Sequence, residues 1–262
     1  MNIEIALTPL VDSLTAYIWP FVRIGAFVMV MPVIGSSFVP PRVRLLLAVA
    51  LTAVIAPVIP PSATTEVLSA EGLVTVIQEI AIGATLGFLV QLVFDAIALG
   101  GQVIGMSMGL GFAVFLDRAR GVNMPVLGQL FLMLGMLVFL SLDGHLALIR
   151  LLAESFTAMP MSAVGMTTDM LGQILVFTGQ MFVFAMRIAL PAITAILVVN
   201  LAFGVMSRAA PTLNLFAIGF PVTMLLGFAV IFLSMDVMTQ NVVLFIGRSL
   251  EAVSTLLESA RP

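Results

Sequence analysis

Long apolar stretches, separated by short groups of proline, glycine or charged residues, follow one another along almost the whole chain. They form six blocks, at residues 14–34, 43–59, 73–104, 126–152, 171–206 and 213–257. A helix needs about 20 mostly apolar residues to cross the hydrocarbon core of a membrane, and each block is near that length or longer. The pattern therefore predicts an all-α protein built from about six long hydrophobic helices.

The last two blocks are too long for one straight membrane span. Pro191 lies near the middle of the fifth block without a polar cluster to end the helix, so the sequence predicts a kink there. The sixth block contains Pro221 and becomes amphipathic after Asp236. Its last part, residues 248–259, has the pattern of an exposed amphipathic helix.

Composition places the chain among the membrane proteins. Hydrophobic residues make up 61% of the sequence and charged residues only 9%, whereas about a quarter of the residues of soluble domains are charged. All ten basic residues are arginine and the formal net charge is -3, which offers no basic surface for nucleic acid. The absence of cysteine excludes disulfides and cysteine-based metal sites, and we expect neither a metal nor a cofactor.

Residues 100–121, GGQVIGMSMGLGFAVFLDRARG, are rich in glycine where the third block ends. Glycines spaced four apart would line one helix face and let another backbone approach closely, and glycines further on would act as hinges. The positions expected to serve one of these purposes are Gly101, Gly105, Gly109, Gly111 and Gly121. The apolar residues that follow form either a flexible turn or a deformable segment that seals a path, and the pattern alone leaves both open.

Ionisable side chains lie inside several apolar blocks, where a charge is costly unless it faces protein or water. They are Arg23, Asp95, Asp143, His145 and Arg187. We favour the interpretation that buried charges of opposite sign pair and fix the register of the helices. The alternative is a proton-coupled small-solute membrane transporter that uses Asp95, Asp143 and Arg187.

Asp143 and His145 form the cluster that most resembles an enzyme site, because a carboxylate and an imidazole could share a proton or a metal. No second histidine exists to complete a zinc site, and no serine lies in a GxSxG turn. The glycine-rich GMSMGLG lacks the lysine of a phosphate-binding loop. We therefore predict no catalytic residue, and a lipid-modifying enzyme centred on Asp143 and His145 is only a third hypothesis.

Five motifs, taken in chain order, make the sequence resemble one family of bacterial membrane proteins. They are PPRVRLLLAVALTAVIAP, GLGFAVFLD, FLSLDGHLALI, SFTAMP and RAAPTLNLFAIGFPV. Together they resemble the FliR family of the bacterial type III export apparatus, which has a near relative in virulence secretion. The segments SLDGH and NLFAIGFP favour the flagellar branch.

The resemblance implies an architecture and a function that residue spacing does not reveal. FliR-family proteins are similar to a fusion of two partners, so residues 1–170 would resemble FliP and residues 171–262 would form a FliQ-like helical hairpin with an amphipathic C-terminal tail. The chain would be a structural, non-enzymatic subunit of the flagellar export gate, in the bacterial inner membrane and the flagellar basal body. Its implied partners are FliP, FliQ and FlhB, with unfolded flagellar export substrates in transit. In such a gate the hydrophobic blocks need not be lipid-facing spans.

The resemblance also implies a pore plug within residues 105–121. In the family, an apolar loop of FliR closes the pore beside methionine-rich loops of FliP until a substrate passes. An apolar seal blocks ions and water by dewetting, and glycine hinges would let it move aside. The matching plug side chains are Phe112, Val114, Phe115 and Leu116, with Met106 and Met108 as gasket-like neighbours.

Overall fold

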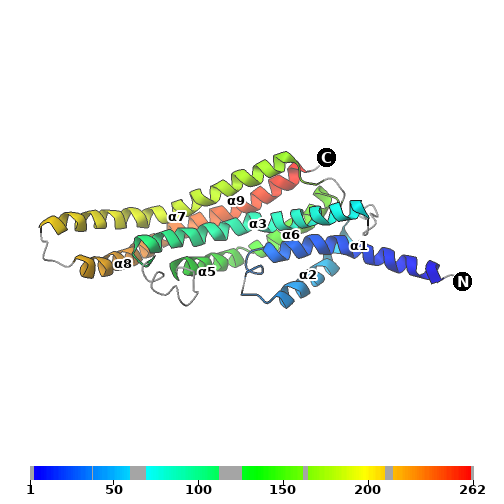
Figure 1. The fold of residues 1–262 in the computed structure, drawn as a ribbon, viewed down its shortest axis with the longest axis horizontal. Helices are drawn as coiled ribbons and strands as arrows, with labels where there is room; N and C mark the ends of the chain where they lie inside the picture. The colour runs from blue at the N-terminus through cyan, green and yellow to red at the C-terminus, as the bar shows by residue number, and fades with distance from the viewer. Residues whose placement is uncertain are drawn as a thin grey trace. The chain divides into compact units, whose positions relative to one another are not determined.

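The computed structural model describes residues 3–36, 38–59, 69–111, 126–161, 165–209 and 215–260. Over these ranges every regular element is helical (Figure 1), which confirms the predicted all-α class. The elements are α1 (Ile3–Val30), α2 (Pro41–Ile55), the 3-10 turn η1 (Ala56–Val58), α3 (Ala70–Ser107), α5 (Val126–Ser141), α6 (Gly144–Ala158), α7 (Thr168–Ala209), α8 (Leu215–Leu233) and α9 (Met235–Ser259).

The fourth predicted block is not one helix, because the chain turns between α5 and α6 at Leu142 and Asp143. Asp143 has a φ of 54°, and its carbonyl accepts the first backbone hydrogen bonds of α6, from Leu146 and Ala147. A left-handed backbone is uncommon outside glycine, and aspartate tolerates it better than most residues. Asp143 therefore begins a new helix and does not lie inside a continuous span.

The sixth predicted block is divided in the same way, since α8 and α9 meet at Ser234 with a bend of 60°. The Ser234 hydroxyl donates to the Val230 carbonyl at 2.6 Å, and its backbone N–H is shared between the carbonyls of Val230 and Ile231. A serine that bonds back to the preceding turn often bends a helix. In contrast, α7 continues through Pro191 as one helix, and the predicted kink at that proline stays a prediction.

Three of the described segments are long and apolar enough to cross a membrane, and up to five are if each bent helix pair counts as one span. The three are residues 41–58, α3 and α7. The estimate rests on length and composition of the described residues, so the six-helix membrane arrangement stays a prediction.

The chain divides into two compact units, each made of separate stretches of sequence. The first contains residues 1–92, 143–178 and 248–262, and the second contains residues 93–142 and 179–247. Helices α3, α7 and α9 each contribute to both units. These units are groups of residues that contact one another. The predicted boundary at residue 170 instead separates a FliP-like part from a FliQ-like part, and it stays a prediction.

In the first unit, α1 packs closely on the first half of α3. Two glycines of α3 that are four residues apart face α1, and a Cβ on Gly83 would collide with the backbone carbonyl of Arg23. A Cβ on Gly87 would lie 2.9 Å from the backbone nitrogen of Met31. Small residues at this spacing let two helix backbones approach each other. Helix α2 follows α1 and contacts it (Figure 1).

In the second unit, aromatic side chains join the long helices. Phe94 of α3 meets Phe139 of α5 edge to face, with ring centroids 5.4 Å apart. Phe184 of α7 stacks on Phe245 of α9, with centroids 3.6 Å apart. An edge-to-face pair stabilises a core beyond the area that it buries. The first pair joins α3 to α5, and the second joins α7 to α9.

The C-terminal part of α9 is amphipathic, as predicted, but its apolar face is not exposed. Val253, Leu256 and Leu257 are almost completely buried, while Glu251 and Glu258 are exposed. The tail is therefore a surface helix that exposes its polar face and buries its apolar stripe. Burial of an apolar stripe is what holds such a helix in place, and sequence alone does not show which surface covers it.

Candidate functional site at the end of helix α3

Helix α3 ends in a hydrogen-bond pattern that depends on glycine. Gly109 has a φ of 85°, its N–H donates to the Met106 carbonyl at 3.0 Å, and the N–H of Leu110 donates to the Gly105 carbonyl at 3.0 Å. These two bonds around a left-handed glycine form the Schellman motif, which stops many helices. The Leu110 side chain reaches back to 3.9 Å from the Cβ position of Gly105. The local sequence therefore specifies where α3 stops.

The two methionines predicted as gasket-like neighbours lie in opposite environments. The side chain of Met106 is 62% exposed, whereas that of Met108 is 0% exposed. Met108 packs against α8 at Gly227, where a Cβ would lie only 2.6 Å from its Cγ atom. Within this chain, Met106 is an exposed side chain, and Met108 is an internal packing residue.

The glycines of the same stretch also differ from one another. Gly101 lies in a close contact, because a Cβ there would stand 2.9 Å from the Cα of Gly128 on α5. Gly105 and Gly111 have ordinary room, with the nearest atoms 3.5 and 3.8 Å from a Cβ position. Gly121 lies outside the described residues. Hinge motion in this stretch stays a prediction.

The predicted plug side chains lie outside the described part of the chain, which stops at Gly111 and resumes at Val126. They are Phe112, Val114, Phe115 and Leu116. Their role stays a prediction. The structure does describe the end of α3 at Gly109, which precedes Phe112 by three residues.

A shallow pocket of about 450 Å³ lies beside the exposed Met106, between the ends of α3 and α7 and the start of α8. Its walls include Phe203 and Phe220 together with the side-chain amide of Asn200. The hydroxyl of Ser107, which also lines it, donates to the Val103 carbonyl at 2.9 Å. The pocket is therefore mainly apolar, and Gly109 at the end of α3 lines it.

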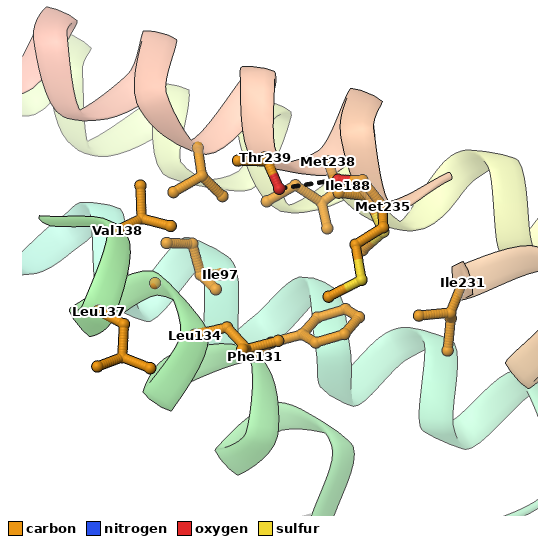
Figure 2. Close-up of a pocket in the computed structure, with 12 residues that line it drawn as sticks. Ile97, Phe131, Leu134, Leu137, Val138, Ile188, Ile231, Met235, Met238 and Thr239 are labelled. Carbon is orange, nitrogen blue, oxygen red and sulfur yellow. Dashed lines mark hydrogen bonds between the residues drawn. The ribbon is translucent and has the colours of Figure 1, made fainter. Parts of the chain in front are cut away.

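A smaller and more enclosed pocket, of about 170 Å³, lies inside the second unit (Figure 2). Among the described lining residues only Thr239 has a polar side chain, and Figure 2 shows its hydroxyl directed at the Met235 carbonyl, 2.8 Å away. Apolar cavities of about this size stay dry and accept apolar molecules. The lining side chains offer nothing for acid–base or metal chemistry.

Arg23 lies at the centre of a fully buried polar cluster in the first unit. It forms a bidentate ion pair with Glu79 of α3, at 2.6 and 2.9 Å, and the two side chains are 0% and 1% exposed. It also donates to the carbonyls of Ser155 and Met159 at the end of α6, each at 2.9 Å, and its guanidinium lies over the ring of Phe156. One side chain of α1 is thereby bonded to α3 and to the last turn of α6.

Sequence reasoning selected Arg23 but missed Glu79. Two features of the sequence point to Glu79. A buried arginine needs a carboxylate partner, and Glu79, Gly83 and Gly87 follow one another at intervals of four residues. Those three positions share one face of α3, which is the face that meets α1.

The other ionisable residues predicted to fix helix register are not buried. Asp95, Asp143 and Arg187 are exposed, and the Arg187 guanidinium lies 5.3 Å from the ring centroid of Phe184. His145 is half-buried, and its Nδ1 atom has no hydrogen-bond partner among the described residues. Their role in pairing stays a prediction. The described residues also contain no group of three side chains that could hold a metal ion.

Comparison with known proteins agrees with the ordered motifs of the sequence. The family model described as bacterial export proteins, family 1, matches residues 14–248. The chain belongs to this family. The FliR-family chain is also similar to curated relatives that carry the name flagellar biosynthetic protein FliR, and the resemblance read from its motifs is therefore confirmed.

Three of these relatives show how far the similarity of the FliR-family chain extends. The protein of Pectobacterium carotovorum is 40% identical over 218 residues, which is 83% of each chain. That of Escherichia coli is 39% identical over 214 residues, or 82% of each chain. That of Aquifex aeolicus is 30% identical over 228 residues, which cover 87% of this chain and 88% of the relative. The range matched by the family model, residues 14–248, includes α3 and the helices that pack against its end.

Proposed function

We propose that the chain is a structural, pore-forming subunit of the flagellar type III protein export gate, and that it contributes an apolar plug. Membership of the bacterial export family, with relatives named flagellar biosynthetic protein FliR, supports the export role. The observation that supports the plug is the helix end at Gly109, which precedes a run of apolar side chains at residues 112–116 by only three residues. An apolar constriction in a channel blocks ions and water by dewetting.

The proposed assembly consists of FliP and FliQ subunits around this chain, with FlhB attached, in the inner membrane at the flagellar basal body. Its cargo is unfolded flagellar substrate. Support comes from the apolar side chains that α7 and α8 leave exposed, among them Leu201, Leu225 and Phe232. Large apolar side chains exposed in such number are typical of a surface that lipid or partner subunits cover. Residues 171–262 would correspond to the FliQ-like hairpin.

The plug is tested by removing its aromatic side chains while leaving the helix end intact. The double substitution Phe112→Ala/Phe115→Ala should raise ion leakage through the membrane of cells that express the assembled complex, because the apolar constriction loses its two largest side chains. Leakage is measured by the uptake of a normally impermeant ion or by loss of membrane potential.

The matched control replaces two exposed phenylalanines of the first unit, Phe38→Ala/Phe88→Ala, which removes the same atoms from residues outside the proposed plug. Both variants must first be shown to accumulate and to co-purify with the other export proteins. Equal leakage from the control and the plug variant, or wild-type tightness in both, would count against a plug in residues 112–116.

A further inference from the structure

Met108 and Gly227 form a size-matched contact between the end of α3 and the middle of α8. The Cγ, Sδ and Cε atoms of Met108 lie 2.6 to 2.8 Å from the place where a Cβ of residue 227 would stand. Met108 is 0% exposed, so its side chain is enclosed and has no solvent to move into. The space that a side chain at residue 227 would need is therefore filled by a methionine from another helix.

A second contact holds the next residue of α3 to the same helix. The ring of Phe220 lies 3.0 and 3.1 Å from the Cβ position of Gly109. Phe220 and Gly227 are seven residues apart, about two turns of α8, and so they share one face. Two consecutive residues at the end of α3 are therefore held by one face of α8.

Met108 is also the last residue before the left-handed glycine of the Schellman motif, and its N–H donates to the Ile104 carbonyl at 3.0 Å. Its backbone belongs to the end of α3 and its side chain is seated in α8. Movement of this side chain would therefore move the point at which the chain leaves the helix. Met106, two residues earlier, is 62% exposed and is not enclosed in this way.

We propose that Met108 is a positioning residue, anchored in a notch of α8 at Gly227, and that this anchor sets the place where the plug segment begins. The functional part of the inference rests on the proposed plug. A thioether side chain has three rotatable bonds and adapts to irregular surfaces, so this anchor holds by shape and carries no charge or hydrogen bond.

The position of the helix end is measured with a spin label. The chain contains no cysteine, and Gly111 has room for a side chain, with the nearest atom 3.8 Å from its Cβ position. A nitroxide attached through Gly111→Cys, in the full chain assembled with cysteine-free export partners, should give a broad resonance line shape. Gly227→Val should displace Met108 and narrow the line, as should Met108→Ala.

In the double variant Met108→Ala/Gly227→Val, the valine side chain occupies the space that the methionine side chain leaves. This variant should restore the broad line. Gly219→Val is the control for valine in α8, because its Cβ position has no atom closer than 3.9 Å, and it should leave the line broad. An unchanged line in Gly227→Val, or a double variant as mobile as the single variants, would overturn the anchor.

Ion leakage then tests the consequence for the gate. Gly227→Val should raise leakage, and the double variant should lower it again. If Phe112→Ala/Phe115→Ala leaks while Gly227→Val stays tight, Met108 is only a packing contact and the positioning role is wrong. If the phenylalanine variant does not leak, the plug itself is contradicted, and the line shape still decides whether Met108 anchors the end of α3.

Discussion

Two single residues determine the end of α3 by different means. Gly109 acts through its backbone, since its φ of 85° lies in the left-handed region, which costs free energy for a residue with a side chain. Met108 acts through its side chain, which fills the notch at Gly227. The first means is visible in the sequence, because a glycine after a helical stretch predicts a helix end. The second is not, because any of the methionines in this stretch could have been the buried one.

The backbone role of Gly109 leads to a prediction at the residue scale. Gly109→Ala should lower the free energy of unfolding by about 1–2 kcal/mol, since an L-residue in the left-handed region costs that amount. Its Cβ would also press on Phe220 at 3.0 Å. Gly111→Ala, which meets ordinary space, is the control. Thermal unfolding of the purified complex measures both, and equal melting temperatures would contradict the role of the positive φ.

The buried Arg23–Glu79 pair gives a second prediction at this scale. Glu79→Gln leaves the guanidinium buried without its counter-charge, and breaking a buried pair from one side costs about 3–5 kcal/mol. Glu154→Gln, an exposed acid on α6, should change little. The charge-free pair Arg23→Met/Glu79→Met should be less damaging than Glu79→Gln. Thermal unfolding or protease resistance measures the relative stability of these variants. If the double variant is less stable than Glu79→Gln, the argument from an uncompensated charge is contradicted.

At the scale of helices, α3 is held by neighbours that approach at glycine. Gly101 meets Gly128 on α5, and a Cβ on Gly100 would lie 3.0 Å from the Ala185 carbonyl oxygen on α7. Small residues at such crossings permit backbone contact that larger residues prevent. The spacing of Gly101 predicted a close approach, but the partner positions on α5 and α7 could not be read from that spacing.

Two glycines of α5 allow this packing to be tested with one kind of substitution. A Cβ on Gly128 would stand 2.9 Å from the Ala98 backbone oxygen, which cannot move without α3, whereas a Cβ on Gly135 would stand 2.8 Å from the tip of the Ile97 side chain. Ile97 also lines the 170 Å³ apolar pocket (Figure 2).

Gly128→Ala should therefore destabilise the complex by about 1–3 kcal/mol, the usual cost of overpacking. Gly135→Ala should cost clearly less, because the displaced methyl group has a cavity to enter. Thermal unfolding of the two variants side by side provides the measurement, and the argument fails if Gly135→Ala is the more damaging substitution.

At the scale of the whole molecule, the chain leaves many large apolar side chains exposed, including Val205 at 71%, Phe232 at 77% and Leu233 at 80%. An isolated soluble protein rarely exposes so many large apolar side chains. The surface agrees with a protein that is completed by a membrane or by other subunits.

This surface leads to a prediction about expression. Made alone, the chain should be degraded or should aggregate after extraction into detergent, because α7 and α8 have no partner to cover them. Co-expression with FliP-like and FliQ-like subunits should raise its level and give one co-purifying complex. Quantitative immunoblotting and size-exclusion chromatography report the result, and a stable, monodisperse single chain would argue against an obligate export-gate subunit.

The sequence alone determined the properties that arise from local interactions. Apolar runs become helices because every backbone hydrogen bond can then be satisfied within the segment, and the stop of α3 at Gly109 is a local motif as well. The family was likewise readable, since its motifs are contiguous stretches of residues. The helix breaks at Asp143 and Ser234 were not predicted, although hydrogen bonds near each residue accompany them.

Only the tertiary structure decided which residues from distant parts of the chain meet. Arg23 and Glu79 are separated by 56 residues, and Met108 reaches a glycine on a helix that begins at Leu215. Pattern and spacing report which face of a helix is apolar or small, but contain no information on the surface opposite. Which surfaces meet is determined by tertiary packing. That packing forms the buried ion pair, covers the apolar face of the α9 tail, and places Met108, the proposed anchor of the plug segment, against α8.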